Sequence, residues 1–265
     1  MNLIIRTTII VLLVLSGLLL IWLITWNTEF QESIIQSIFV KDYQTNPIIN
    51  SRIHIIYTIF CGLSFFYGLF LFIFFRKTTS PEILYLIISV LSFAFLSLRF
   101  PISLIIPGYY MIVPPTTIIR SYYFFYLFSI SLFFLGGLFS NGIPFLKQNI
   151  ILSVSFFISF TIALILPLNY NGIVPVAPPV FSYHGMLSLF IRVLEVSAVI
   201  NYLTAAKRNN NIQYILLTLS LLLLLVGLES VYSFFSIPVM IIGIILYLTG
   251  LILFANRIYR IRLWN

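Results

Sequence analysis

The chain has 265 residues, of which 61% are hydrophobic and only 8% are charged, and its formal net charge is +8. Soluble domains carry about 25% charged residues, so this composition, with a mean hydropathy of +1.13, excludes an ordinary soluble protein. The basic residues are scattered instead of clustered, which argues against nucleic-acid binding, and the single cysteine excludes an intramolecular disulfide.

Eight hydrophobic stretches fill almost the whole chain. A helix needs about 20 apolar residues to cross about 30 Å of hydrocarbon, and each stretch is close to that length. The sequence therefore predicts an all-α, polytopic membrane helix bundle with eight spans. The predicted spans are Thr7–Trp26, Ile53–Phe75, Ile83–Phe100, Ser121–Phe139, Ile150–Leu168, Tyr183–Ala205, Ile212–Val231 and Pro238–Phe254.

The first span is predicted to be an N-terminal anchor helix within residues 1–26. A cleaved signal peptide is the alternative, because Arg6 precedes an apolar stretch near the N-terminus. That stretch is longer than the roughly 7–15 apolar residues of a typical signal peptide. The segment from Trp22 to Trp26 also offers no small-residue cleavage site. We therefore expect an anchor.

Residues 27–52 form the one sizeable segment outside the predicted spans. Ile34, Ile35, Ile38 and Phe39 recur there at helical spacing beside Glu29, Glu32 and Gln36. This pattern indicates an amphipathic helix on the membrane surface, and a partly ordered loop is the alternative. Residues 53–256 then form a seven-span bundle, followed by a basic tail at 257–265.

The distribution of basic residues predicts the orientation of the chain. With the N-terminus inside, nine basic residues fall on the cytoplasmic side and three fall outside, in accordance with the positive-inside rule. We expect an inner-membrane protein with both termini in the cytoplasm. The residues predicted inside are Arg6, Arg76, Lys77, Lys147, Lys207, Arg208, Arg257, Arg260 and Arg262; those predicted outside are Lys41, Arg52 and Arg120.

Ionisable residues inside predicted spans are the candidates for function, because a charge in hydrocarbon costs several kcal/mol unless it is paired or hydrated. Arg192 and Glu195 are three residues apart in the sixth span, so they share one helical face and can form an ion pair. The pair is either a neutralised structural contact or part of a ligand-linked or proton-linked switch.

A second group of charged or titratable residues is predicted at one depth, in the outer leaflet. Glu229 lies near the outer end of the seventh span, Arg99 at the end of the third, Arg120 at the start of the fourth and His184 at the start of the sixth. If they converge, they form a polar pocket for a small anionic or zwitterionic ligand. The alternative is that each side chain extends independently towards the headgroups.

The sequence argues against several enzymes and pigments, and we predict no cofactor and no bound metal. No lysine lies in a span to carry retinal, and His54 and His184 lack metal-ligand spacing. No HExxH, GxSxG or phosphate-binding glycine loop occurs. A thiol site of Cys61, Arg99 and His184, as in exosortase-like membrane transpeptidases, is disfavoured because Cys61 lies well inside its span.

Small and aromatic residues in the spans are interpreted as packing residues. Glycines at six positions would let helices approach closely, and the run from Tyr122 to Tyr126 is typical of core and interfacial aromatics. The glycines concerned are Gly62, Gly68, Gly136, Gly137, Gly243 and Gly250.

From Ile53 to Asn256 the chain resembles the membrane region of bacterial seven-helix receptors with diverse intracellular signalling modules. The segment Phe60–Phe70 with Arg76-Lys77 resembles the first receptor helix and its basic turn. Leu98-Arg99 and Arg120–Tyr123 resemble the following helix and the entry to the next. Gly227–Val231, with Glu229 where the family usually has Asp, resembles a later helix and precedes Ile237-Pro238, Gly243, Gly250 and Asn256-Arg257.

This resemblance implies a receptor-like membrane signalling module. The family's external sensing domain would stand where residues 27–52 are, which is too short, and no output domain follows Asn265. The resemblance therefore implies a module that senses a small ligand from the outer side and relays to a separate cytoplasmic partner, and that is not an enzyme. Homo-oligomers are compatible with it. The alternatives are a small-solute permease that uses Arg192 and Glu195, or a membrane scaffold subunit.

Overall fold

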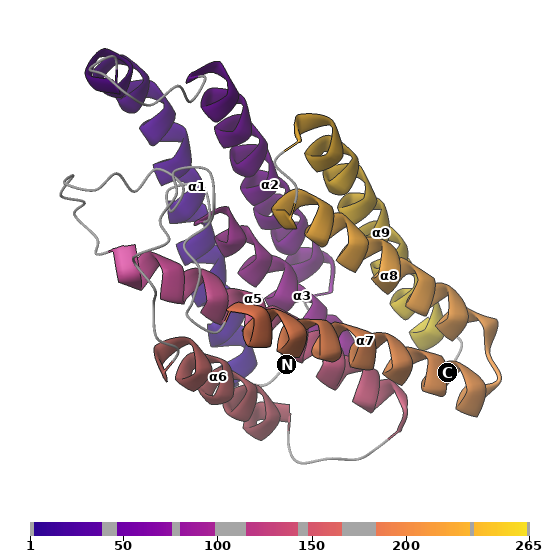
Figure 1. Ribbon diagram of the computed structural model, residues 1–265. Coiled ribbons are helices and arrows are strands. Elements are labelled where there is room, and N and C mark those ends of the chain that lie inside the picture. The colour runs from indigo at the N-terminus through magenta and orange to yellow at the C-terminus, as the bar shows by residue number, and fades with distance from the viewer. Residues whose placement is uncertain are drawn as a thin grey trace.

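The computed structural model describes residues 3–38, 47–75, 80–98, 115–142, 148–165, 184–233 and 236–263 (Figure 1). Within these residues every regular element is a helix, and eight helices are long and apolar enough to cross a membrane. This confirms the predicted all-α polytopic bundle. The helices are α1 (Leu3–Ile38), α2 (Pro47–Phe74), α3 (Pro81–Ala94, extended by the 3-10 turn η1, Phe95–Leu98), α5 (Pro115–Ser140), α6 (Gln148–Ile165), α7 (His184–Asn209), α8 (Ile212–Ser233) and α9 (Ile237–Leu263).

The first and last helices extend beyond their predicted spans. The membrane-length part of α1 ends at Thr25, yet the helix continues to Ile38. Residues 34–38, in which a separate surface helix was expected, thus belong to α1, and Phe39 lies outside the described residues. The expected tail likewise continues α9 as far as Leu263. Neither extension contains a proline or glycine that would stop the helix.

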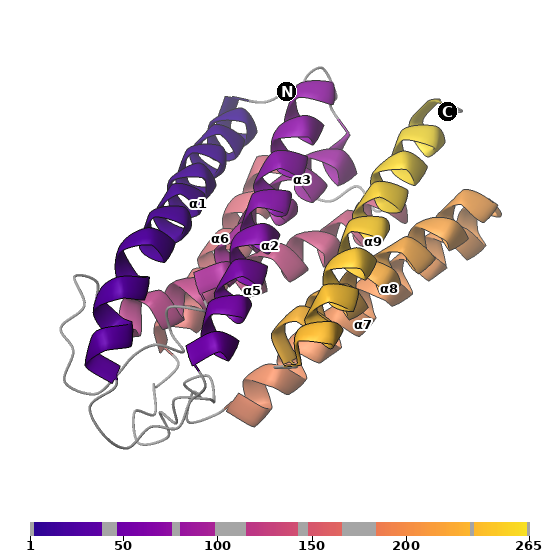
Figure 2. The ribbon, with the colours of Figure 1, turned by 90° about the horizontal axis from the view of Figure 1, so that it is seen from above.

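Both ends of the chain lie at the same end of the bundle, as an even number of spans requires (Figure 2). We call this the termini end and the opposite one the far end. The N-terminal parts of α5, α7 and α9 lie towards the far end, and their C-terminal parts lie towards the termini end (Figures 1 and 2). Helix α8 runs in the opposite direction to its neighbours α7 and α9.

Helix α3 is the central element, packed against α1, α2, α5 and α9. Every residue from Glu82 to Ala94 is buried. The helix begins with Pro81 in its first turn, where a missing backbone N–H costs nothing, and the Ser80 hydroxyl donates to Glu82 Oε2 at 2.6 Å. A helix that is buried on all sides explains why the third hydrophobic stretch lacks a polar face.

Close glycine contacts hold α8 and α9 together as the most extensive helix pair. A Cβ atom on Gly227 would lie 2.4 Å from the Tyr247 backbone nitrogen, and one on Gly250 would lie 2.5 Å from the Leu224 nitrogen. The prediction of close packing is confirmed for Gly250 and also for Gly243. It is wrong for Gly62, where a Cβ would meet Leu20 at an ordinary 3.6 Å.

Candidate functional site

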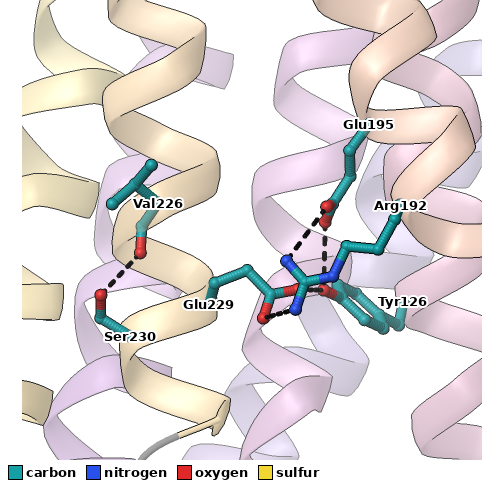
Figure 3. Close-up of polar contacts among 6 residues, drawn as sticks. All are labelled: Tyr126, Arg192, Glu195, Val226, Glu229 and Ser230. Carbon is teal, nitrogen blue, oxygen red and sulfur yellow. Dashed lines mark hydrogen bonds and ion pairs between the residues drawn. The ribbon is translucent and has the colours of Figure 1, made fainter. Parts of the chain in front are cut away.

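Four polar side chains from three helices meet in the membrane-spanning part of the bundle (Figure 3). Arg192 Nη2 on α7 donates to Glu229 Oε2 on α8 at 2.6 Å, and Arg192 Nη1 lies 3.7 Å from Glu195 Oε2. The Tyr126 hydroxyl on α5 lies 2.9 Å from Glu229 Oε1 and 3.2 Å from Glu195 Oε1. We call Tyr126, Arg192, Glu195 and Glu229 the polar network.

The helices place these side chains towards the far end of the bundle. Arg192 stands eight residues after the start of α7, which is about 12 Å along the axis, and Glu229 stands four residues before the end of α8, about 6 Å from it. The two long side chains bridge this difference in depth. Glu195 follows Arg192 by three residues and therefore lies on the same helical face.

The members of the polar network differ in exposure. The side chain of Glu195 is 7% exposed and that of Glu229 is 18% exposed, whereas Arg192 is 52% exposed. Removing one partner of a buried ion pair leaves the other charge uncompensated, which is costly. The arrangement therefore stabilises the contact between α7 and α8 while leaving the guanidinium accessible at one side.

In the polar network the positive and negative charges do not balance, and one hydrogen-bond donor is shared between two acceptors. It contains one guanidinium and two carboxyl groups, so with both carboxyls ionised its net charge is −1. The phenol of Tyr126 has one hydrogen to share between two acceptor oxygens. The network therefore has room, electrostatically, for one further positive charge.

The predicted pairing of Arg192 with Glu195 is confirmed, although the contact is long at 3.7 Å. Within the described residues Glu229 forms an ion pair with Arg192 on the neighbouring helix. The sequence analysis placed Glu229 near the outer end of its span and considered only Glu195 as a partner for Arg192. It did not take account of the reach of the two side chains along antiparallel neighbours.

Of the remaining predicted site residues, Arg120 has a described side chain, and it forms no ion pair with the polar network. Arg120 lies in the second turn of α5, with its Nε buried and without a hydrogen-bond partner. Arg99 lies outside the described residues. His184 begins α7, but its side chain is not among those described. The expected convergence of these four groups therefore stays a prediction, and the described residues show a network centred on Arg192.

Tyr126 is the functional candidate that the sequence analysis missed, because the whole run from Tyr122 to Tyr126 was interpreted as packing. Its ring is indeed buried. A buried tyrosine hydroxyl nevertheless requires a hydrogen-bond partner, and two carboxyl groups in apolar spans require donors. Matching these two requirements would have pointed to a tyrosine, though not to this one of the three in the run.

A second polar group, the termini-end seam, joins the other end of α5 and α7. Asn141 Nδ2 donates to Asn201 O at 2.8 Å, and Asn201 Nδ2 donates to Phe134 O at 3.2 Å. Arg208 Nη1 donates to Asn141 O. Gly142, with φ of +67°, ends α5 in the left-handed region that favours glycine. These contacts use backbone carbonyls as acceptors and contain no carboxylate.

No family model, curated protein or solved structure matches this chain. The resemblance to seven-helix bacterial receptors therefore stays a prediction. Across the described residues, no three or more His, Cys, Asp or Glu side chains come together in a way that could hold a metal ion. What the polar network can do chemically is exchange ion-pair partners or accept a charged group beside Arg192.

Proposed function

We propose that this protein is a receptor-like membrane signalling module in which the polar network is the ligand-sensitive element. The observation that carries the proposal is that one half-exposed guanidinium is shared between two carboxyl groups on adjacent helices, with Tyr126 linking both to a third helix. A ligand that competes for Arg192 would therefore change the contact between α7 and α8. The resemblance to seven-helix receptors favours the same interpretation.

The proposed sidedness places both termini in the cytoplasm of a bacterial cell. Exposed basic residues gather at the termini end, at the start of α1, the end of α7 and the end of α9, which supports this orientation under the positive-inside rule. The residues are Arg6, Lys207, Arg208 and Arg260. The polar network then lies in the outer half of the membrane, and the basic termini end faces a separate cytoplasmic signalling partner.

The charge of the polar network favours a zwitterionic ligand over a purely anionic one. An anion attracted by Arg192 would also meet two carboxyl groups and would bring the net charge to −2, whereas the ammonium group of a zwitterion offsets the charge of its own carboxylate and leaves the net charge at −1. In the proposed exchange, the ligand's carboxylate pairs with Arg192 and its ammonium pairs with Glu229. After this exchange Arg192 and Glu229 each face an opposite charge of the ligand, Glu195 still lies beside Arg192, and the net charge of the network stays at −1.

The proposed relay runs through α8 and α9. When Glu229 leaves Arg192, α8 loses its ionic contact with α7 but keeps its close glycine contacts with α9. The two helices would therefore shift together against the rest of the bundle, and α9 ends in the basic segment that reaches the cytoplasm. The ligand drives this shift only to the extent that it binds the shifted arrangement more tightly.

The test combines a binding screen with a distance measurement on purified protein in nanodiscs. A panel of amino acids and betaines is screened for compounds that raise the unfolding temperature. Spin labels at Val193 on α7 and Val226 on α8, in a Cys61→Ala background, then report the separation of the helices. We expect an active compound to stabilise the parent and to widen this distance.

The matched variants are Glu229→Gln and Ser230→Ala. Glu229→Gln removes the charge that the ligand's ammonium would contact, so both responses should be lost. Ser230 is the next residue on α8 and its hydroxyl bonds only within its own helix, to Val226 O at 2.8 Å (Figure 3), so Ser230→Ala should respond as the parent does. Equal responses from Glu229→Gln and the parent would contradict the proposal.

A permease that uses Arg192 and Glu195 is the alternative function, favoured by the combination of an accessible guanidinium and a buried carboxyl group. Liposome flux distinguishes the two functions. A permease must move the bound compound down a gradient and lose this flux in Glu195→Gln, whereas a receptor moves nothing. A scaffold subunit, the third hypothesis, would give neither a ligand response nor a flux and would co-purify with one protein partner.

A further inference from the structure

A cavity of about 390 Å³ opens between α6 and α7, with α5 as its floor. Among the described helices, α6 packs extensively only against α5, so α6 and α7 stand apart across this opening. The lining consists of residues from all three helices and contains no charged side chain. Its volume falls within the range of about 300–1,000 Å³ that is usual for small-molecule sites.

The polar groups of this cavity are largely satisfied by one another. The hydroxyls of Ser131 on α5 and Ser155 on α6 hydrogen-bond to each other, and Ser131 Oγ also donates to Phe128 O at 2.8 Å. A cavity with an apolar lining and few free polar groups does not hold ordered water. Its occupant is therefore expected to be apolar.

The mouth of the cavity is continuous with the lipid-facing surface of the bundle. The lining includes Val154 and Ile158 on α6 and Phe190 on α7, which are 48%, 54% and 41% exposed. All three lining helices have membrane-spanning length and hydropathy. The opening thus faces hydrocarbon, and the molecules that reach it are the acyl chains of the bilayer.

We propose that this cavity is a binding site for one acyl chain of a bilayer phospholipid. The lack of a charged group in the lining means that the site takes a tail and no headgroup. Phospholipids supply most of the tails of a bilayer, and a bound phospholipid would keep its headgroup at the membrane surface and insert only one chain. The tail then fills the gap between α6 and α7 and holds α6 to the bundle.

The site lies beside the polar network without being part of it. Leu127 on α5 and Leu194 on α7 line the cavity, and each is the sequence neighbour of a network residue, Tyr126 or Glu195. The acyl chain would thus contact the same pair of helices that the network joins. The proposal does not depend on the receptor function, because it requires only the cavity and the membrane.

Native mass spectrometry of the detergent-purified full chain tests the proposal. We expect the parent to retain one phospholipid molecule after extensive washing. Val154→Trp places a bulky side chain at the mouth and should abolish retention. The matched control is Val196→Trp, at a valine of similar exposure on α7 that does not line the cavity, and it should retain the lipid. Ser159→Leu, at a buried lining position, provides a second blocking variant.

Fluorescence quenching locates the retained chain. Trp22, Trp26 and Trp264 are replaced with phenylalanine, and Phe190→Trp supplies a reporter in the cavity lining. Phospholipid with dibrominated tails should quench this reporter at a lower mole fraction than it quenches Val193→Trp, which faces bulk lipid from the same helix.

Each contrary result would overturn the proposal. Equal retention by Val154→Trp and Val196→Trp would mean that the lipid binds elsewhere, and absence of retained lipid from the parent would mean that the cavity has no specific occupant. A retained mass equal to a free fatty acid would refute the choice of source. Identical quenching of Phe190→Trp and Val193→Trp would show ordinary exchanging lipid only.

Discussion

Different kinds of interaction hold the two ends of the contact between α5 and α7. Towards the far end, charged and phenolic side chains reach across helices and bond to one another. At the termini end, amide side chains bond to backbone carbonyls, and Gly137 lets the helices touch. A backbone carbonyl cannot leave its helix, whereas an ion pair can exchange partners. The comparison indicates a fixed end and an exchangeable end of one helix pair.

The fixed end and the exchangeable end of the contact between α5 and α7 lie far apart along the helices. Asn141, which directly follows α5, stands 15 residues after Tyr126, a separation of about 22 Å along the helix axis. A small rotation about the termini-end seam would therefore give a larger displacement at the polar network. Substitutions at the two ends should differ in size, in their dependence on charge and in their effect on each other.

The largest effect is expected at the fixed end, from Gly137→Ala. Its Cβ would lie 2.7 Å from Asn201 Cβ, 3.3 Å from the Tyr202 ring and 3.4 Å from Ala198 O, so the helices must separate. Overpacking of this kind costs about 3 kcal/mol at the upper end of its usual range. Thermal unfolding in detergent measures the loss. Gly62→Ala is the control, because its Cβ would lie at an ordinary 3.6 Å from the Leu20 side chain. Equal losses of stability in the two variants would refute a tightly packed seam.

The next largest effect is expected at the exchangeable end, from Arg192→Met. This change leaves Glu195 and Glu229 facing each other without a cation. We expect a loss of about 2 kcal/mol, below the usual 3–5 kcal/mol for breaking a buried pair, because Arg192 is 52% exposed. The same unfolding measurement applies.

A compensating change distinguishes charge from packing at Arg192. Adding Glu229→Gln to Arg192→Met removes one of the two unpaired carboxylates, so part of the lost stability should return. Arg260→Met, on an exposed basic residue of α9, is the control and should change stability by less than about 0.5 kcal/mol. If the double variant is less stable than Arg192→Met alone, charge repulsion is not the cause.

A smaller effect is expected from Tyr126→Phe, which removes only the shared hydroxyl. Both carboxyl groups then lose a donor while the ring packing remains, and we expect a loss of about 1 kcal/mol. Tyr259→Phe, at an exposed ring on α9, should be neutral. A loss in Tyr126→Phe no greater than that in Tyr259→Phe would mean that the phenol does not hold α5 to the network.

The smallest effect is expected from Asn141→Ala, at about 0.6 kcal/mol, the average for a hydrogen bond between membrane helices. Its side-chain amide makes one such bond, to Asn201 O on α7, and a second bond to Gly137 O on its own helix. The change should add to that of Arg192→Met, because the sites lie far beyond the distance of about 10 Å within which effects couple. A measured coupling would mean that the two ends are not independent.

Hydropathy was sufficient to predict the helices, but not their neighbours. All eight spans follow from composition and length, because a membrane requires every backbone polar group to be satisfied within a helix. The pairing of Arg192 with Glu195 follows from a spacing of three residues on one helix. The extension of α1 to Ile38 was missed because it depends on the absence of a helix stop, not on hydropathy.

The contact of Arg192 with Glu229 and Tyr126 required knowledge that a single sequence does not carry. It depends on α7 lying between α5 and α8 and on which faces of these helices meet. Hydrophobic stretches carry little information about faces, because lipid and the bundle interior are almost equally apolar. The separation of α6 from α7, and hence the cavity, was unpredictable for the same reason.

The contact between α8 and α9 has a consequence for how the protein is made. At Gly227 and Gly250 backbone meets backbone, and the short connection between the two helices favours their pairing as soon as both have been inserted. In chain order they follow the other six candidate spans of the described residues. The pair would then dock, as a hairpin that has already formed, onto segments inserted before it.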